Sequence, residues 1–260
     1  MVGSGKVFLA LMFFALAIGL FPTASRAGAG GAGAMDYDSL DPDPFAGEAA
    51  GPVVKVRDPI EPVNRFFFAV NDRLYFWLIK PVAQGYEAVM PDPLEEGISN
   101  FFSNLKAPIR MVNNLLQAEF RGFGTESGRF IVNSTIGLAG FFDVADRAFA
   151  LKPRREDLGQ TLGRYGIGDG FYICWPVFGS SSLRDSVGLA GDSYLSPLSY
   201  LAREDFRAGA GAYSLKTVNA AEEKGEVYED MKKSSLDPYI AARTAYFQYR
   251  ASRVRNEILD

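Results

Sequence analysis

The chain has 260 residues, of which 48% are hydrophobic and 22% charged, and its formal net charge is −4. A chain of this size can bury one large core or two modest ones, and its negative charge argues against a nucleic-acid partner. It contains no histidine and a single cysteine, Cys174, which removes the commonest general base, imidazole metal sites, disulfides within the chain and cysteine zinc sites. These exclusions favour a protein without a catalytic centre, a metal or a cofactor.

The N-terminus has the pattern of a secretory signal peptide. Lys6 precedes an apolar run over residues 7–21, and small residues then offer a cleavage site between Ala27 and Gly28. A membrane anchor is the alternative, but it needs a span of about 20 apolar residues, and this run is shorter and breaks at Pro22. We therefore expect the first 27 residues to be removed and the mature chain to be exported.

The rest of the chain divides by composition. Residues 28–54 are mainly Gly, Ala, Asp and Pro, which predicts a disordered leader. We expect one folded domain over residues 55–250, and a C-terminal tail over residues 251–260.

The first helix of that domain is predicted to begin near Pro62, because proline suits the first helical turn. Placed at 100° per residue, its apolar side chains form a face about 120° wide. Our candidate for a membrane-facing surface is this face, formed by Phe66, Phe67, Val70, Leu74 and Trp77. Only a thin polar seam remains on the other side. Such a helix is either buried in the protein or, in an exported protein, laid into lipid.

Further helices are predicted along the rest of the chain, over residues 92–105, 109–120, 130–142, 182–190 and 202–233, and from Pro238 onward. Residues 130–142 are strongly apolar, but this run is too short for an ordinary spanning helix. In the last helix we expect Arg243, Arg250 and Arg253 to point outward, opposite an apolar face. No segment shows sustained strict alternation. The sequence therefore predicts an all-α single domain of short amphipathic and apolar helices.

The stretch from Glu156 to Asp185 combines closely spaced glycines with aromatic residues, which predicts a long loop with no helix running through it. Either it is an apolar loop folded into the core, or it lines or gates an apolar passage. Cys174 within it is expected to be a small buried residue rather than a nucleophile. The candidate residues for lining or gating such a passage are Tyr165, Gly166, Gly168, Gly170, Phe171, Tyr172, Trp175, Pro176, Phe178, Arg184 and Asp185.

Weaker motifs in the same region do not support catalysis. The spacing Gly166-x-Gly168-x-Gly170 is not that of a dinucleotide site, and it does not follow a predicted strand. The serine run over residues 180–182 lacks both the G-x-S-x-G pattern and a histidine partner. The carboxylates of Glu156 and Asp157 are expected to mark a helix N-terminus with local ion pairs.

Three stretches together resemble the MlaA/VacJ family of outer-membrane phospholipid-transport proteins. They are DPIEPVNRFFFAVND (58–72), EDLGQTLGRYGIGDGFYICWPVFGSSSLRDSVG (156–188) and SSLDPYIAARTAYFQYR (234–250). MVNNLLQ (111–117) and IVNSTIGLAGFFDVA (131–145) also resemble family segments, in the same order. The resemblance covers about residues 55–250.

The resemblance implies a helical ring in the periplasmic (inner) leaflet of the bacterial outer membrane, with a central channel near the Gly/aromatic loop. It implies that the protein draws mislocalised phospholipids from the outer leaflet and passes them to a periplasmic lipid-carrier protein, alongside a trimeric porin. Many members carry an acylated cysteine at the mature N-terminus, whereas this chain has Ala27-Gly28 at its candidate cleavage site. A non-catalytic outer-membrane scaffold bound to porins is the alternative, and a phospholipase would need a nucleophile and a base that we do not find.

Overall fold

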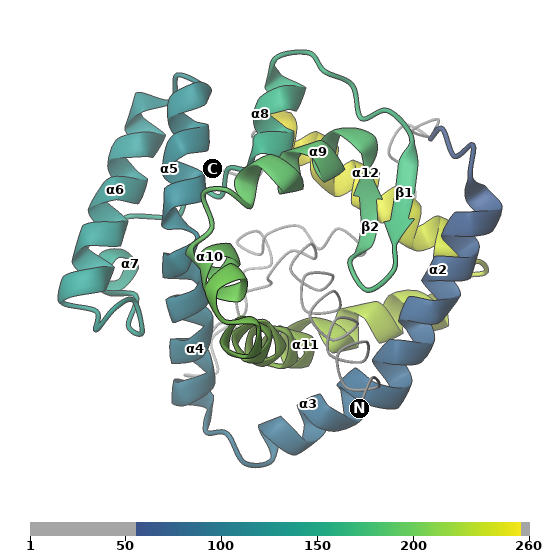
Figure 1. The fold of residues 1–260 in the computed structure, drawn as a ribbon, viewed down its shortest axis with the longest axis horizontal. Coiled ribbons are helices and arrows are strands. Elements are labelled where there is room, and N and C mark those ends of the chain that lie inside the picture. Colours follow the sequence, from purple (N-terminus) through teal and green to yellow (C-terminus); the bar gives the residue numbers. More distant parts are fainter. Residues whose placement is uncertain (1–55, 256–260) are drawn as a thin grey trace, which may run out of the picture.

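The computed structural model describes residues 56–255, except for the side chains of residues 222–224. The predicted signal peptide, its cleavage site at Ala27–Gly28, the leader and the end of the tail lie outside these residues. The fold is mostly helical, and its helices follow one another around a ring-like circuit (Figure 1). The elements are α2 (Glu61–Leu74), η3 (Tyr75–Ile79), α3 (Lys80–Glu87), α4 (Asp92–Leu105), α5 (Ala107–Leu116), α6 (Phe120–Thr135), α7 (Val144–Phe149), α8 (Leu158–Arg164), β1 (Tyr172–Trp175), β2 (Gly179–Ser182), α9 (Leu183–Asp192), α10 (Pro197–Glu204), α11 (Phe206–Ser234) and α12 (Pro238–Arg255).

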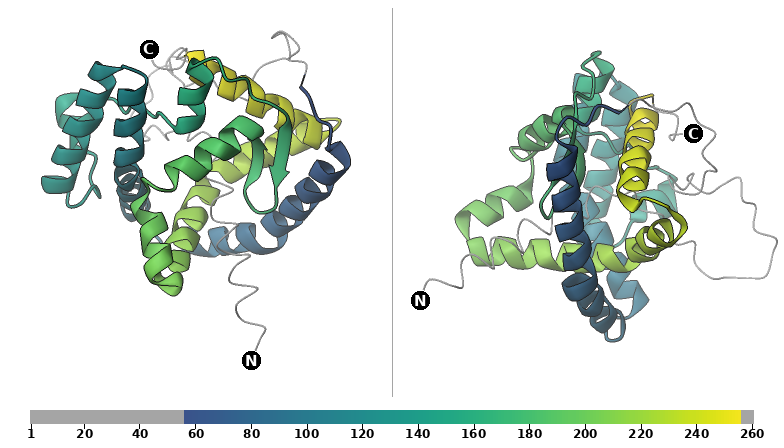
Figure 2. Two further views of the ribbon diagram at one scale, coloured as in Figure 1. Left: turned by 45° about the horizontal axis from the view of Figure 1, so that its top comes forward. Right: turned by 90° about the vertical axis from the view of Figure 1, so that its right-hand side faces the viewer.

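The circuit is closed by contacts between distant parts of the chain. α11 packs against α3, α4 and α10, and Figure 2 shows it running across the molecule from α10 to α12. α12 packs on α8 and β2, whereas α6 lies outside the circuit against α5, and α7 packs on α6 (Figure 1). The first helix, α2, packs on β1, and the last helix, α12, packs on α8 and β2. Both ends of the domain therefore meet at the segment from α8 to α9.

The helical path that begins with α2 continues past Pro81. α2 passes into the π-helical turn η3, in which the Lys80 N–H bonds to the Tyr75 carbonyl, and α3 then starts with Pro81 in its first turn. Proline lacks the N–H that an α-helix needs at an interior position. Because the turn before Pro81 already has wider π-type bonding, the chain passes through it without a break.

Two other predicted helices have different bounds in the structure. The helix predicted over residues 202–233 is divided between α10 and α11 at Asp205, whose carboxylate caps α11 by accepting the N–H groups of Arg207 and Ala208. The apolar run predicted over residues 130–142 is helical only to Thr135. It then turns through left-handed residues that include Gly140, where a Cβ atom would lie 2.3 Å from the Asn104 side chain.

The stretch from Glu156 to Asp185 is not the continuous loop that we predicted. It begins with α8, and after an exposed turn it forms an antiparallel hairpin in which Tyr172 pairs with Ser182 and Cys174 with Ser180. Ser182 then caps α9 by accepting the Asp185 N–H. The prediction was wrong because strands of four residues are too short to show alternation in the sequence.

Candidate functional site

The hairpin is held against α2 by two asparagines that lie two helical turns apart. The Asn64 side chain donates to the Tyr172 carbonyl at 3.0 Å and accepts the Cys174 N–H at 2.8 Å. The Asn71 side chain donates to the Trp175 carbonyl at 2.9 Å and accepts the Val177 N–H at 2.6 Å. Each amide therefore completes the hydrogen bonding of the open edge of β1, as a neighbouring strand would.

Replacing Asn64 by leucine should destabilise the protein by roughly 2 to 4 kcal/mol, because a buried backbone carbonyl and a buried N–H of β1 each lose a partner. Asn64 is 1% exposed, so water cannot substitute without rearrangement. The expected result is a lower thermal unfolding midpoint in detergent. The matched control is Asn100→Leu, which removes one long 3.4 Å bond to the Phe141 carbonyl and should cost clearly less. Equal losses in the two variants would contradict this account of the hairpin.

The predicted aromatic residues of the hairpin divide between the core and the surface. Tyr172 is fully buried among Tyr239, Tyr246 and Phe247 of α12. Trp175 is exposed, and its indole N–H donates to the Ser186 hydroxyl at 2.9 Å. The other predicted members, Phe171, Pro176 and Phe178, are half-buried. The structure thus places Tyr172 in the packing of the hairpin and leaves Trp175 on its open side.

The glycines of the site form an exposed turn between α8 and β1, residues 165–170, which we call the glycine turn. Gly166 and Gly170 have φ values of 83° and 76°, whereas Gly168 is outside the left-handed region. A Cβ atom at Gly166 or at Gly168 would meet no other atom within 4 Å. Tyr165 is exposed, and its hydroxyl donates to the Leu116 carbonyl of α5. Gly166 and Gly168 therefore face open space, whereas a Cβ atom at Gly170 would lie 2.9 Å from the Leu183 side chain.

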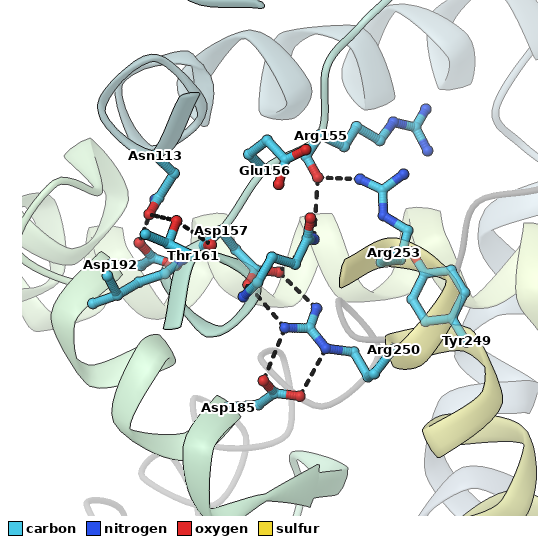
Figure 3. Close-up of polar contacts among 12 residues, drawn as sticks. Asn113, Arg155, Glu156, Asp157, Thr161, Asp185, Asp192, Tyr249, Arg250 and Arg253 are labelled. Carbon is cyan, nitrogen blue, oxygen red and sulfur yellow. Dashed lines mark hydrogen bonds and ion pairs between the residues drawn. The ribbon is translucent and has the colours of Figure 1, made fainter. Parts of the chain in front are cut away.

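A buried cluster of charged side chains lies behind this turn (Figure 3). The Arg250 guanidinium, which α12 carries, contacts Asp157 at the N-terminus of α8 and Asp185 in the first turn of α9, both at 2.7 Å. Asp185 also accepts the Tyr246 hydroxyl and the Arg184 Nε, the latter at 3.0 Å. Asp157 caps α8 by accepting the Gln160 N–H. The cluster therefore joins α8, α9 and α12 through the starts of two helices.

This cluster corrects the predicted orientation of α12. We expected Arg250 and Arg253 to point outward, but both are buried. Arg250 is drawn inward by two carboxylates, and Arg253 by the Arg155 carbonyl. A buried arginine is stable only with such partners, and α12's own sequence does not contain them.

Burial and neighbouring charges shift the pKa values of groups in the cluster, and burial shifts that of Cys174 in the hairpin. Burial acts to raise the pKa of Asp157, but the Arg250 guanidinium and the α8 N–H groups hold that pKa well below its usual range. The pKa of Asp192 is raised to about 6 by burial, although the Leu158 N–H opposes the shift. Burial raises the pKa of the Cys174 thiol to about 12. Cys174 is thus a buried, protonated thiol, as predicted, and not a nucleophile.

The predicted membrane-facing helix exposes only part of its apolar face. Phe66 is 63% exposed and Trp77 80%, whereas Phe67 packs on the hairpin core and Leu74 on a cluster around Ile79. Val70 is half-buried. Other exposed apolar side chains lie on α3 and just after it, and on α6, α7 and the turn between them, among them Val82, Val89, Phe120, Ile131, Ile136, Leu138 and Phe149.

Residues 56–255 contain neither a membrane-spanning helix nor a metal-binding cluster. Between residues 56 and 255 no helix is both long enough and apolar enough to span a membrane. The same residues contain no group of acidic residues and Cys174 arranged to hold a metal ion. The features described above define a class of helical proteins with exposed apolar side chains, a hairpin bound to α2 and a buried ion-pair cluster.

The chain belongs to the MlaA lipoprotein family, whose model matches residues 56–253. The intermembrane phospholipid transport system lipoprotein MlaA of Escherichia coli K12 is 36% identical over 197 residues, which cover 74% of this chain and 76% of that protein. An uncharacterized protein of Rickettsia felis is 32% identical over 224 residues, covering 85% and 88%. One solved structure is similar to this chain, with a TM-score of 0.67 and 35% sequence identity, and the match covers 76% of this chain and 98% of that one. Its subject is the structural basis for maintenance of bacterial outer membrane lipid asymmetry.

Proposed function

We propose that this protein is the outer-membrane component of a phospholipid transport system. It removes mislocalised phospholipids from the outer leaflet and passes them to a periplasmic lipid carrier, so that the lipid asymmetry of the outer membrane is maintained. The observation that carries this function is family membership over the whole described domain, with relatives in Escherichia coli and Haemophilus influenzae that bear the name of a phospholipid transport lipoprotein. Family members are transport proteins rather than enzymes.

A passive mechanism suits the distribution of side chains. A diacyl lipid that moves between leaflets must bring its charged headgroup past hydrocarbon, which is costly. A ring with apolar side chains outside and polar groups inside lowers this cost while the lipid tails remain in the bilayer. Exposed Phe66 and Trp77 support contact of α2 and η3 with lipid. Direction then comes from downstream partners.

The glycine turn and the hairpin are our candidates for the lipid path. Because Asn64 and Asn71 fasten β1 to α2, the hairpin itself is a fixed wall. The segment that has room to move is the glycine turn, from Tyr165 to Gly170, which borders the start of β1. Arg184 and Asp185 lie at its base. Movement of this turn would re-aim Phe171, the residue that follows it.

The partners and the attachment of the protein follow from the same proposal. We propose a phospholipid substrate, a trimeric porin beside the ring and a periplasmic lipid-carrier protein as acceptor. The single cysteine of the sequence, Cys174, is buried in the hairpin. With Ala27-Gly28 at the predicted cleavage site, attachment to the periplasmic leaflet then rests on the apolar surface of the ring.

Lipid transfer in a purified system tests the function. The protein is placed in vesicles with its porin, and the vesicles are incubated with the soluble carrier. Intact phospholipid should appear on the carrier only when the protein is present. Release of fatty acid would indicate a lipase, and no transfer in any combination of the components would indicate a scaffold.

Replacing Gly168 by proline should stiffen the glycine turn, because proline fixes φ near roughly −65°. Gly168 has space for the ring and lies outside the left-handed region, so the helices should form normally. We expect normal protein level and membrane location but sensitivity to detergent, which reports loss of lipid asymmetry. Gly168→Ala is the matched control, since it fills the same space and leaves φ free. Full detergent resistance of Gly168→Pro would remove the turn from the mechanism.

A further inference from the structure

The glycine turn is attached to the body of the protein through a buried side chain, that of Arg184. Arg184 Nη2 lies 2.7 Å from Asp169 Oδ1, and its Nη1 lies 3.5 Å from the Ile167 carbonyl oxygen, to which it donates. The Arg184 side chain is 5% exposed, whereas that of Asp169 is 40% exposed. A guanidinium under the turn thus contacts both a side chain and the backbone of its central residues.

Packing contributes little to the position of the turn. Gly166 and Gly168 have no neighbours where a Cβ would stand, and Ile167 is exposed. Backbone hydrogen bonds secure the two ends. The Gly166 and Ile167 N–H groups bond back to α8, and the Arg184 N–H bonds to the Asp169 carbonyl. The ion pair of the Asp169 side chain with Arg184 adds to this backbone bond, and it is the charged side-chain contact of the turn.

The other side of Arg184 is fixed. Its Nε donates to Asp185 at 3.0 Å, and Asp185 is held by Arg250 and Tyr246 of α12. Arg184 also extends from the first turn of α9, which Ser182 caps. Loss of Asp169 therefore leaves Arg184 in place with a remaining carboxylate partner. The releasable half of the pair is the carboxylate on the turn.

We infer that Asp169 is a positioning residue that latches the glycine turn onto Arg184, and that breaking this ion pair frees the turn to move. The latch is a property of the structure, whereas its effect on lipid passage rests on the proposed function. The contact is an ion pair whose carboxylate is 40% exposed, so it contributes at most about 1 kcal/mol. Losing it should raise the population of the released turn by up to roughly fivefold.

A spin label on the turn tests the latch directly. The chain's own cysteine, Cys174, is 2% exposed, so Ile167→Cys provides an exposed thiol for labelling, and the unsubstituted protein is the labelling control. In membranes, Asp169→Asn should add a mobile component to the spectrum, and Asp169→Glu, which keeps the charge, should not. Thermal unfolding midpoints of the variants should agree, because Asp169 lies at the surface. An unchanged spectrum in Asp169→Asn, or equal mobility in Asp169→Glu, would overturn the latch.

Lipid transfer to the soluble carrier, measured on the same variants, separates the two levels of the inference. We expect the transfer rate to change in Asp169→Asn and to return to the original value in Asp169→Glu. If only the spectrum changes, the latch stands and its role in lipid passage is refuted. If the original protein itself transfers no lipid, the proposed function fails, while the spectra still decide the latch.

Discussion

Replacing Arg250 by methionine should cost roughly 3 to 5 kcal/mol of folding free energy, which is the typical loss when one partner of a buried ion pair is removed. Arg250 is 6% exposed and separates Asp157 from Asp185. Without it, the half-buried Asp157 carboxylate at the start of α8 would lose its ion pair, and the buried Asp185 carboxylate at the start of α9 would keep only Arg184 and Tyr246. Domains of this size have only about 5 to 15 kcal/mol of stability in total. We therefore expect severe loss of the protein in cells and a much lower unfolding midpoint in detergent.

Arg147→Met is the matched control for this experiment. Arg147 pairs with Glu96, and both side chains are more than half exposed, so this pair should contribute about 0 to 1 kcal/mol. Adding Asp157→Asn to Arg250→Met should restore part of the lost stability, because Arg250 is the ion-pair partner that the structure shows for Asp157, and asparagine can still cap α8. If Arg250→Met and Arg147→Met behaved alike, the cluster would not be what joins α12 to α8 and α9.

Local signals in the sequence predicted the elements that depend on local chemistry. Ser182 caps α9, and Asp237 caps α12 by accepting the N–H groups of Tyr239 and Ile240. The all-α class and the first helix were also confirmed. Capping depends on residues three positions apart, and amphipathic helices on a period of 3.6 residues, so both can be read from a short window.

The parts that were missed depend on partners far away in the chain. The hairpin forms because Asn64 and Asn71 complete the edge of a strand more than 100 positions later. The thin polar seam of the first helix contained both residues, and their spacing of two turns was the available signal. Arg250 points inward because Asp157 and Asp185 meet it there. The periodicity of α12 alone carries no information about those carboxylates. The prediction that Arg250 points outward therefore followed from the local sequence but was wrong in the fold.

Replacing both Phe66 and Trp77 by aspartate should release the folded protein from the membrane. Both side chains are largely exposed, Phe66 on α2 and Trp77 on η3. If this surface lies in lipid, each charge in hydrocarbon costs roughly 2.5 to 3.5 kcal/mol at the centre of a bilayer and less near its surface. Two such charges are enough to reverse marginal partitioning, while the core does not change. We expect the variant to fractionate as a soluble, folded protein when membranes are separated by centrifugation.

Phe67→Asp is the contrasting variant, because Phe67 belongs to the predicted face but packs against the hairpin core. A charge at that position is buried in the protein rather than in lipid, so Phe67→Asp should unfold the domain and lead to degradation. The two variants therefore separate contact with lipid from contact with the core on one helix. If the Phe66→Asp/Trp77→Asp protein stayed bound to membranes, the outer face of α2 would not be the membrane surface. Attachment would then have to come from the exposed apolar side chains of α6 and the turns that follow it, such as Phe120, Ile131 and Leu138.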